Sequence, residues 1–73
     1  MDKSDAIAGS LRAHRAMAKI TQAQLSEATG FNAATISAWE NRAGISFADA
    51  WDVADFYGVS LDDLAGRKFV EAV

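Results

Sequence analysis

The chain has 73 residues, of which 51% are hydrophobic, and its formal net charge is −3. This length suits a single domain, and the apolar content is too high for a disordered chain. The absence of cysteine excludes disulfides and thiolate metal sites, and no apolar run reaches the roughly 20 residues that span a bilayer. We therefore expect a soluble cytoplasmic protein with neither a membrane segment nor a signal peptide.

The charged side chains are unevenly divided along the chain. Residues 1–44 carry five basic and four acidic side chains, whereas residues 45–73 carry two basic and six acidic ones. This distribution allows a polyanion to meet the first part while the acidic part faces away. It permits a nucleic-acid partner but does not by itself indicate one.

The first predicted helix spans about residues 4–17. Ser4 can cap its start, and Leu11 and His14 fall on one face at helical spacing. Lys19 follows at a position where glycine would be the natural stop. The chain has one histidine and no cysteine, so we interpret His14 as a partly buried structural residue rather than a metal ligand.

The second predicted helix spans about residues 22–29. Thr21 can cap it, and Gln24 stands three residues later, at the spacing of a capping box. Gly30 ends it, because only glycine enters the left-handed conformation without steric cost. The expected inward side chains are Leu25 and Ala28.

The third predicted helix spans about residues 33–41 and follows a cap at Asn32. Ile36 and Trp39 form its inward face. Two short helices joined by a glycine-containing turn make up a helix-turn-helix over residues 21–41. The other side of the third helix is lined by Ala33, Ala34, Ser37, Ala38 and Asn41.

Two further helices are expected after a loop. Ser46 and Ser60 can cap them, each with an aspartate three residues later, and each helix ends at a glycine. No stretch shows the alternation or the hairpin dipeptides that are typical of strands. We expect Trp51 in the core. Candidates for a subunit contact, or for packing on the domain itself, are Phe56 and the tail residues Phe69, Val70 and Val73.

Four segments stand in the order and near the spacing of a known family: LRAHR (11–15), ITQAQLSEATGF (20–31), TISAWEN (35–41) and FYGVSLDDLAG (56–66). In these segments the chain resembles the phage repressor/Cro type of helix-turn-helix domain. The resemblance implies a compact, all-α domain of five helices over residues 1–66, followed by a short tail at 67–73. It also implies binding to double-stranded operator DNA, as a homodimer on half-sites about one helical turn apart, with the helix at 33–41 in the major groove.

The same resemblance implies roles for individual residues. The residues expected to contact DNA phosphates are Thr21, Gln22, Asn32, Asn41 and Arg42. Thr21 and Asn32 can equally act only as caps, and Arg42 can be merely a solvated cation. Arg15 and Glu40 match a family ion pair that links the first and third helices, and we expect its role to be structural.

The base-facing residues, which are Ala33, Ala34, Ser37 and Ala38, depart from the pattern of well-studied family members. Alanine cannot form the bidentate hydrogen bonds that distinguish adenine or guanine, although it can contact a thymine methyl group. Three explanations follow. Sequence specificity comes from DNA shape, or it comes from residues outside this set such as Asn41 and Arg42, or the domain binds a ligand other than DNA. A further interpretation is that these alanines are only good helix formers on an exposed face.

We therefore expect a small transcriptional regulator, a repressor that acts by occupying its operator. We expect no cofactor, metal or small-molecule ligand, and no separate ligand-sensing domain. The alternative is a protein-interaction module of the same fold, antitoxin-like or regulatory, with little or no DNA binding. An enzyme is not expected, because no catalytic constellation is found and Asp62 and Asp63 are explained as a solvated side chain and a capping partner.

Overall fold

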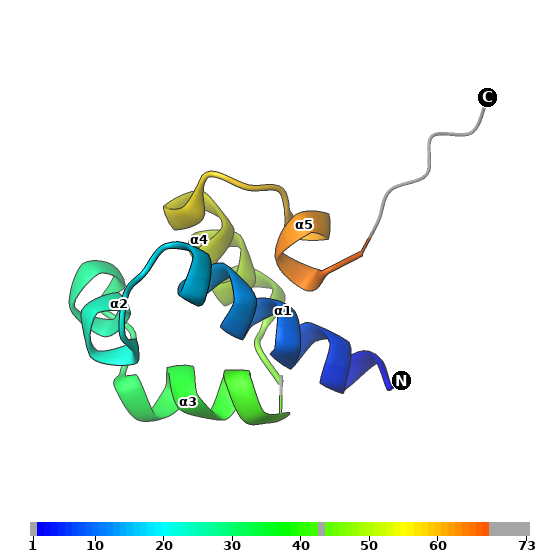
Figure 1. Ribbon diagram of the computed structural model, residues 1–73, viewed down its shortest axis with the longest axis horizontal. Helices are drawn as coiled ribbons and strands as arrows, with labels where there is room; N and C mark the ends of the chain where they lie inside the picture. The colour runs from blue at the N-terminus through cyan, green and yellow to red at the C-terminus, as the bar shows by residue number, and fades with distance from the viewer. Residues whose placement is uncertain (1, 43, 68–73) are drawn as a thin grey trace.

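The computed structural model describes residues 2–42 and 44–67, and these residues form five helices and no strand. The helices are α1 (Lys3–Met17), α2 (Gln22–Thr29), α3 (Ala33–Arg42), α4 (Phe47–Tyr57) and α5 (Leu61–Ala65). α1 crosses the middle of the molecule, with α3 packed on one side of it and α5 on the other (Figure 1). The predicted all-α architecture is confirmed. No helix in the described part of the chain is both long and apolar enough to cross a membrane.

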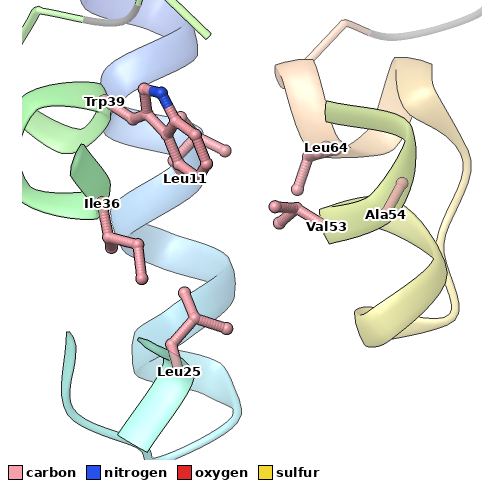
Figure 2. Packing of buried hydrophobic residues seen from close by; sticks show 7 residues of the cluster. All are labelled: Leu11, Leu25, Ile36, Trp39, Val53, Ala54 and Leu64. Carbon is pink, nitrogen blue, oxygen red and sulfur yellow. The ribbon is translucent and has the colours of Figure 1, made fainter. Parts of the chain in front are cut away.

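The core takes at least one buried side chain from every helix. Figure 2 shows Val53 and Leu64 pointing from α4 and α5 toward the helices that carry Leu11 and Ile36. Burying a side chain of this size stabilises the fold by about 1.5–3 kcal/mol. Helices this short are marginal in isolation, so they depend on this shared core. Its members are Leu11, Leu25, Ile36, Trp39, Val53, Ala54 and Leu64.

Local hydrogen bonds start α2 as the sequence predicts. The Thr21 hydroxyl accepts from the backbone N–H of Gln24 at 3.0 Å, and the Gln24 side chain accepts from the backbone N–H of Thr21 at 2.8 Å. Both halves of the capping box are therefore present. The other predicted caps are made by Asn32, Ser46 and Ser60, each accepting a backbone N–H of the helix that follows.

The start of α1 differs from the prediction, and its end shows how the helix stops without a glycine. Ser4 is not the cap, because the backbone oxygen of Asp2 already accepts from Ala6 at 3.0 Å and Ser4 lies inside the first turn. At the other end Lys19 has a φ of 57°, the left-handed conformation that glycine would favour. Its N–H donates to Ala16, and the N–H of Ile20 donates to Arg15, which is the pattern of a Schellman motif.

The inward face of α4 is rotated away from one predicted core residue. Val53 and Ala54 are buried, whereas Trp51 is 55% exposed, so its expected core position is wrong. At about 100° per residue, the centre of a face that buries positions 53 and 54 lies about 110° around the helix from position 51, which places Trp51 at the border of that face. Ala28 of α2 is likewise exposed rather than inward. Residues 68–73, with the predicted contact residues of the tail, lie outside the described residues.

Candidate nucleic-acid interface

The turn between α2 and α3 is held by one glycine and one aromatic anchor. Gly30 has a φ of 84°, and its N–H donates to Ser26 at 2.8 Å, which stops α2. The rings of Phe31 and of Trp39 in α3 meet edge to face, with centroids 5.0 Å apart and planes at 75°. Edge-to-face contact of this kind adds to the hydrophobic gain from burying the rings. The angle between the two helices is therefore set by packing as well as by the turn.

Glu40 of α3 is buried, at 3% exposure, and is paired with Arg15 of α1. The Arg15 guanidinium donates to both carboxylate oxygens, at 2.7 and 2.9 Å, and its third nitrogen donates to the backbone oxygen of Ile20 at 2.9 Å. Arg12 adds a hydrogen bond to the backbone oxygen of Glu40. α1 thus holds the C-terminal half of α3 by charge-assisted bonds, which are the stronger kind.

Gln22 joins the same network from α2. Its side-chain nitrogen donates to Glu40 at 3.3 Å, so one carboxylate connects three helices. Gln22 is accordingly only partly exposed. The family resemblance implied that both its side chain and its backbone N–H contact a DNA phosphate. The contact with Glu40 fixes the position of the first turn of α2 relative to α3. A phosphate contact by Gln22 would have to come from its backbone N–H or from the remaining hydrogen of its amide.

The environment of Glu40 keeps it ionised. Burial raises the pKa of its carboxyl, but hydrogen bonds from Arg15 and Gln22, together with the nearby charges of Arg15 and Arg12, hold the pKa below its ordinary value of 4.5. The hydrogen bond to Glu40 raises the pKa of Arg15. At neutral pH both side chains carry charge, and each compensates the desolvation of the other.

The expected phosphate-contacting residues fall at the ends of the two helices. Thr21 and Gln22 stand at the start of α2, Asn32 directly before α3, and Asn41 and Arg42 at the end of α3. All are exposed except Gln22. Among the described residues Arg42 has no ion-pair partner. Two of these side chains also have local roles, because Thr21 caps α2 and Asn32 caps α3.

The outward face of α3 is dominated by methyl groups. Ala34 and Ala38 are exposed one turn apart, whereas Ala33 and Ser37 are partly buried and lie at the edge of this face. Asn41 donates its side-chain amide to the backbone oxygen of Ser37 at 2.8 Å and lies 3.4 Å from the Ser37 hydroxyl. This bond engages the amide nitrogen and leaves the amide oxygen of Asn41 as the atom that can accept from a base.

Thr35 also belongs to this exposed face, and sequence reasoning did not assign it a role. It is exposed on α3, three residues before Ala38. Residues at this spacing are neighbours on a helix surface, so helical periodicity applied to the outward face would have included it. Thr35 adds a hydroxyl and a methyl group to a face that otherwise offers few polar atoms.

His14 takes part in packing between α1 and α4. Its Nδ1 atom lies 2.8 Å from the backbone oxygen of Ser10, and its ring centroid is 5.8 Å from that of Tyr57. The ring is partly buried. These contacts agree with the structural role expected from the sequence, and they lie away from the exposed face of α3.

Comparison with known proteins identifies one family. A family model described as helix-turn-helix matches residues 11–64, about three quarters of the chain. No curated protein and no solved structure shows a significant match. The matched segment includes α2, the turn and α3, together with both members of the Arg15–Glu40 pair.

Proposed function

This chain belongs to the helix-turn-helix family of DNA-binding transcription regulators, and from that premise we propose that it is a small repressor that binds an operator in double-stranded DNA. The observation that carries the proposal is the α2–turn–α3 unit inside the matched segment. Its two helices are held at a defined angle by Glu40 and Phe31, and the outer face of α3 is exposed. Members of this family are typically not enzymes, and we propose no catalytic activity.

In the proposed complex α3 lies in the major groove and α2 crosses the phosphate backbone. The start of α2 offers the Thr21 hydroxyl and the unpaired backbone N–H groups of a helix N-terminus, which favour an anionic phosphate. Asn41 and Arg42 offer further contacts from the opposite end of α3. These contacts position the protein on the duplex, and Arg42 adds an electrostatic attraction that salt weakens.

We propose that α3 makes few contacts with the bases and that most of these contacts are apolar. Ala34 and Ala38 present methyl groups that can pack on thymine methyls, and Asn41 presents an acceptor for the exocyclic amino group of adenine or cytosine. Few other polar atoms lie on this face, so the remaining specificity is proposed to come from DNA shape.

The regulator is proposed to act as a homodimer on two half-sites and to repress by excluding other proteins from the operator. A two-fold dimer places two α3 helices about one turn of DNA apart, which multiplies the modest specificity of each half. The proposed subunit contacts are Phe56, which is 43% exposed on α4, and the tail at residues 67–73.

The experiment that tests the function is a binding titration against fragments selected from genomic DNA. We expect Arg42→Ala to weaken binding on all fragments and to lower the slope of log K against log salt by about 0.9, the value for one lost phosphate contact. Gln22→Ala should weaken binding without a comparable change in slope, since its side chain is neutral. Arg67→Ala is the matched control, because Arg67 is exposed beyond α5. This variant should bind DNA with the same affinity as the wild type.

Two observations favour the alternative of a protein-interaction module. The second part of the chain is acidic and the outer face of α3 carries few polar groups. If no fragment binds below micromolar concentration at low salt while a defined protein partner copurifies with the chain, the repressor proposal is wrong and the module is the better description.

A further inference from the structure

Large apolar side chains are exposed on α4. Phe47 is 72% exposed, Trp51 is 55% exposed and Phe56 is 43% exposed, and the remaining large exposed apolar residue of the described part is Met17 on α1. The rings of Phe47 and Trp51 lie one helical turn apart in an edge-to-face arrangement, with centroids 6.4 Å apart. The fold gains little from two aromatic rings held in water, whereas adjoining exposed apolar side chains often mark an interaction site.

Hollows lie beside both rings. A groove of about 420 Å³ between α1, α4 and α5 is lined by Ile7, Phe47, Ala50 and Leu61, among others. A second hollow of about 230 Å³ is lined by Trp51 together with Ala54, Val59 and the same Leu61. We call this combined surface, defined by Ile7, Phe47, Ala50, Trp51 and Leu61, the aromatic groove. Its size and apolar lining suit a few aliphatic side chains of a partner.

The lining of the aromatic groove carries more acidic than basic side chains. Asp62 and Arg67 line the larger hollow, and Asp55 lines the smaller one. Residues 44–67 carry one basic side chain, Arg67, and five aspartates. None of the five aspartates forms an ion pair within the described residues. The five are Asp49, Asp52, Asp55, Asp62 and Asp63. A second copy placed on the same surface would bring these carboxylates together, so charge favours a basic partner over self-association.

The aromatic groove also lies apart from the proposed DNA-binding face. α3 packs on α1 and α2, whereas α5 packs on α1 and α4, and α3 and α5 lie on opposite sides of α1 (Figure 1). An acidic surface is repelled by a duplex. A protein partner can therefore occupy this surface while α3 contacts DNA.

We propose that the aromatic groove docks a basic amphipathic segment of a partner protein. Apolar side chains of the segment pack against Phe47 and Trp51, and its Lys or Arg side chains pair with Asp55 and Asp62. This is the helix-in-groove mode of recognition, with the groove supplied by α1, α4 and α5. The proposal does not depend on DNA binding, and either one can fail without the other.

The test uses the full chain and a defined probe. The probe is an 18-residue amphipathic peptide with leucine on one helical face and lysine on the other, and its matched counterpart carries glutamate in place of lysine. Titration into ¹⁵N-labelled protein at low ionic strength should perturb resonances of α4, α5 and the Ile7 region, and leave those of α3 unchanged. The glutamate peptide should bind at least about ten-fold more weakly.

Variants separate the apolar contribution from the acidic one. The double variant Phe47→Ser, Trp51→Ser should lower the affinity for the lysine peptide by about ten-fold or more, since two exposed aromatic anchors are lost. Met17→Ser is the matched control, because Met17 is 70% exposed on α1 and should leave binding unchanged. Asp55→Asn with Asp62→Asn should weaken binding at low salt but not at high salt, and it removes no apolar contact.

Four results would overturn the proposal. The first is equal binding of the two peptides, and the second is wild-type binding by the Phe47→Ser, Trp51→Ser variant. The third is a dimer in sedimentation equilibrium that Phe47→Ser converts to a monomer, which would make a second copy the occupant. The fourth is peptide binding that occurs only after deletion of residues 68–73, which would make the chain's own tail the occupant.

Discussion

Arg15 of α1 and Glu40 of α3 form a two-pronged ion pair, with Nε 2.7 Å from one carboxylate oxygen and Nη2 2.9 Å from the other. The carboxylate is almost fully buried, and Gln22 of α2 donates to it as well. A buried pair of this kind contributes less to net stability than to the choice of one geometry. Here the geometry in question is the position of α3 relative to α1 and α2.

Removing one partner of this pair should destabilise the fold more than removing both. We expect Arg15→Met to cost roughly 3 kcal/mol, because it leaves a buried carboxylate without its cation, and Glu40→Leu to cost less, because Arg15 keeps some access to water. The double variant should be more stable than either single variant. Urea unfolding of all four proteins gives the coupling energy, and additive losses would show that the pair is not coupled.

Stability should fall in acid through Glu40. Burial raises the pKa of this carboxyl, but the hydrogen bonds and charges of Arg15, Gln22 and Arg12 outweigh it and hold the pKa below its ordinary value of 4.5. A lowered folded-state pKa means that the stabilisation is present above pH 4.5 and is lost as the pH falls through the folded value. Unfolding free energies between pH 3 and 7 should show a smaller acid loss in Glu40→Gln than in wild type. Glu27→Gln, at an exposed position of α2, should keep the wild-type profile.

Lys19→Gly should stabilise the protein. Lys19 has a φ of 57°, and a residue with a Cβ atom pays roughly 1–2 kcal/mol for this left-handed conformation. Glycine avoids that cost but loses more backbone entropy on folding, so we expect a net gain of about 0.5–1 kcal/mol. Ala18→Gly is the control one residue earlier: its φ of −77° is ordinary for alanine, and this change should destabilise. The thermal midpoints of both variants test this prediction, and a lower midpoint in Lys19→Gly than in wild type would contradict it.

The hydroxyl of Tyr57 should contribute nothing to stability. It is buried and finds no hydrogen-bond partner among the described residues, and burial raises the pKa of Tyr57 above its ordinary value. Tyr57→Phe should therefore be neutral or stabilise by up to about 1 kcal/mol. Thr29→Val is a matched loss of a bonded hydroxyl, since Thr29 donates to Leu25 at 2.7 Å and accepts from Phe31, and it should cost about 1 kcal/mol. Chemical denaturation that ranked the two variants in the opposite order would refute this account.

If α3 reads thymine methyl groups, removing those methyls from the DNA should weaken binding. Replacing thymidine by deoxyuridine within a selected site deletes the methyl and leaves every hydrogen bond in place. Each methyl packed on Ala34 or Ala38 is worth about 0.8 kcal/mol, roughly a four-fold loss of affinity. The same replacement outside the site is the control. Unchanged affinity, with binding otherwise intact, would assign specificity to DNA shape instead.

Local signals in the sequence predicted where helices begin and end. Thr21 and Gln24 are three residues apart, and Gly30 stops the helix that they start, so the bounds of α2 follow from bonds that the segment makes with itself. The same holds for the starts of α4 and α5 at their serine caps. The end of α1 is an exception, because Lys19 adopts a left-handed conformation that its residue type does not signal. The side chain of Arg15 holds this turn by donating to the backbone oxygen of Ile20 at 2.9 Å.

The five helices and their order could be predicted from the residues alone, because capping and helical periodicity act within about four residues along the chain. The packing of the helices against one another decided the side chains at the borders of each buried face and the contacts between distant segments that no local pattern signals. It exposed Trp51 and turned Gln22 toward Glu40. The physical reason is that burial depends on how distant helices rotate against one another, and that rotation is set by the packing of the whole core rather than by any one segment.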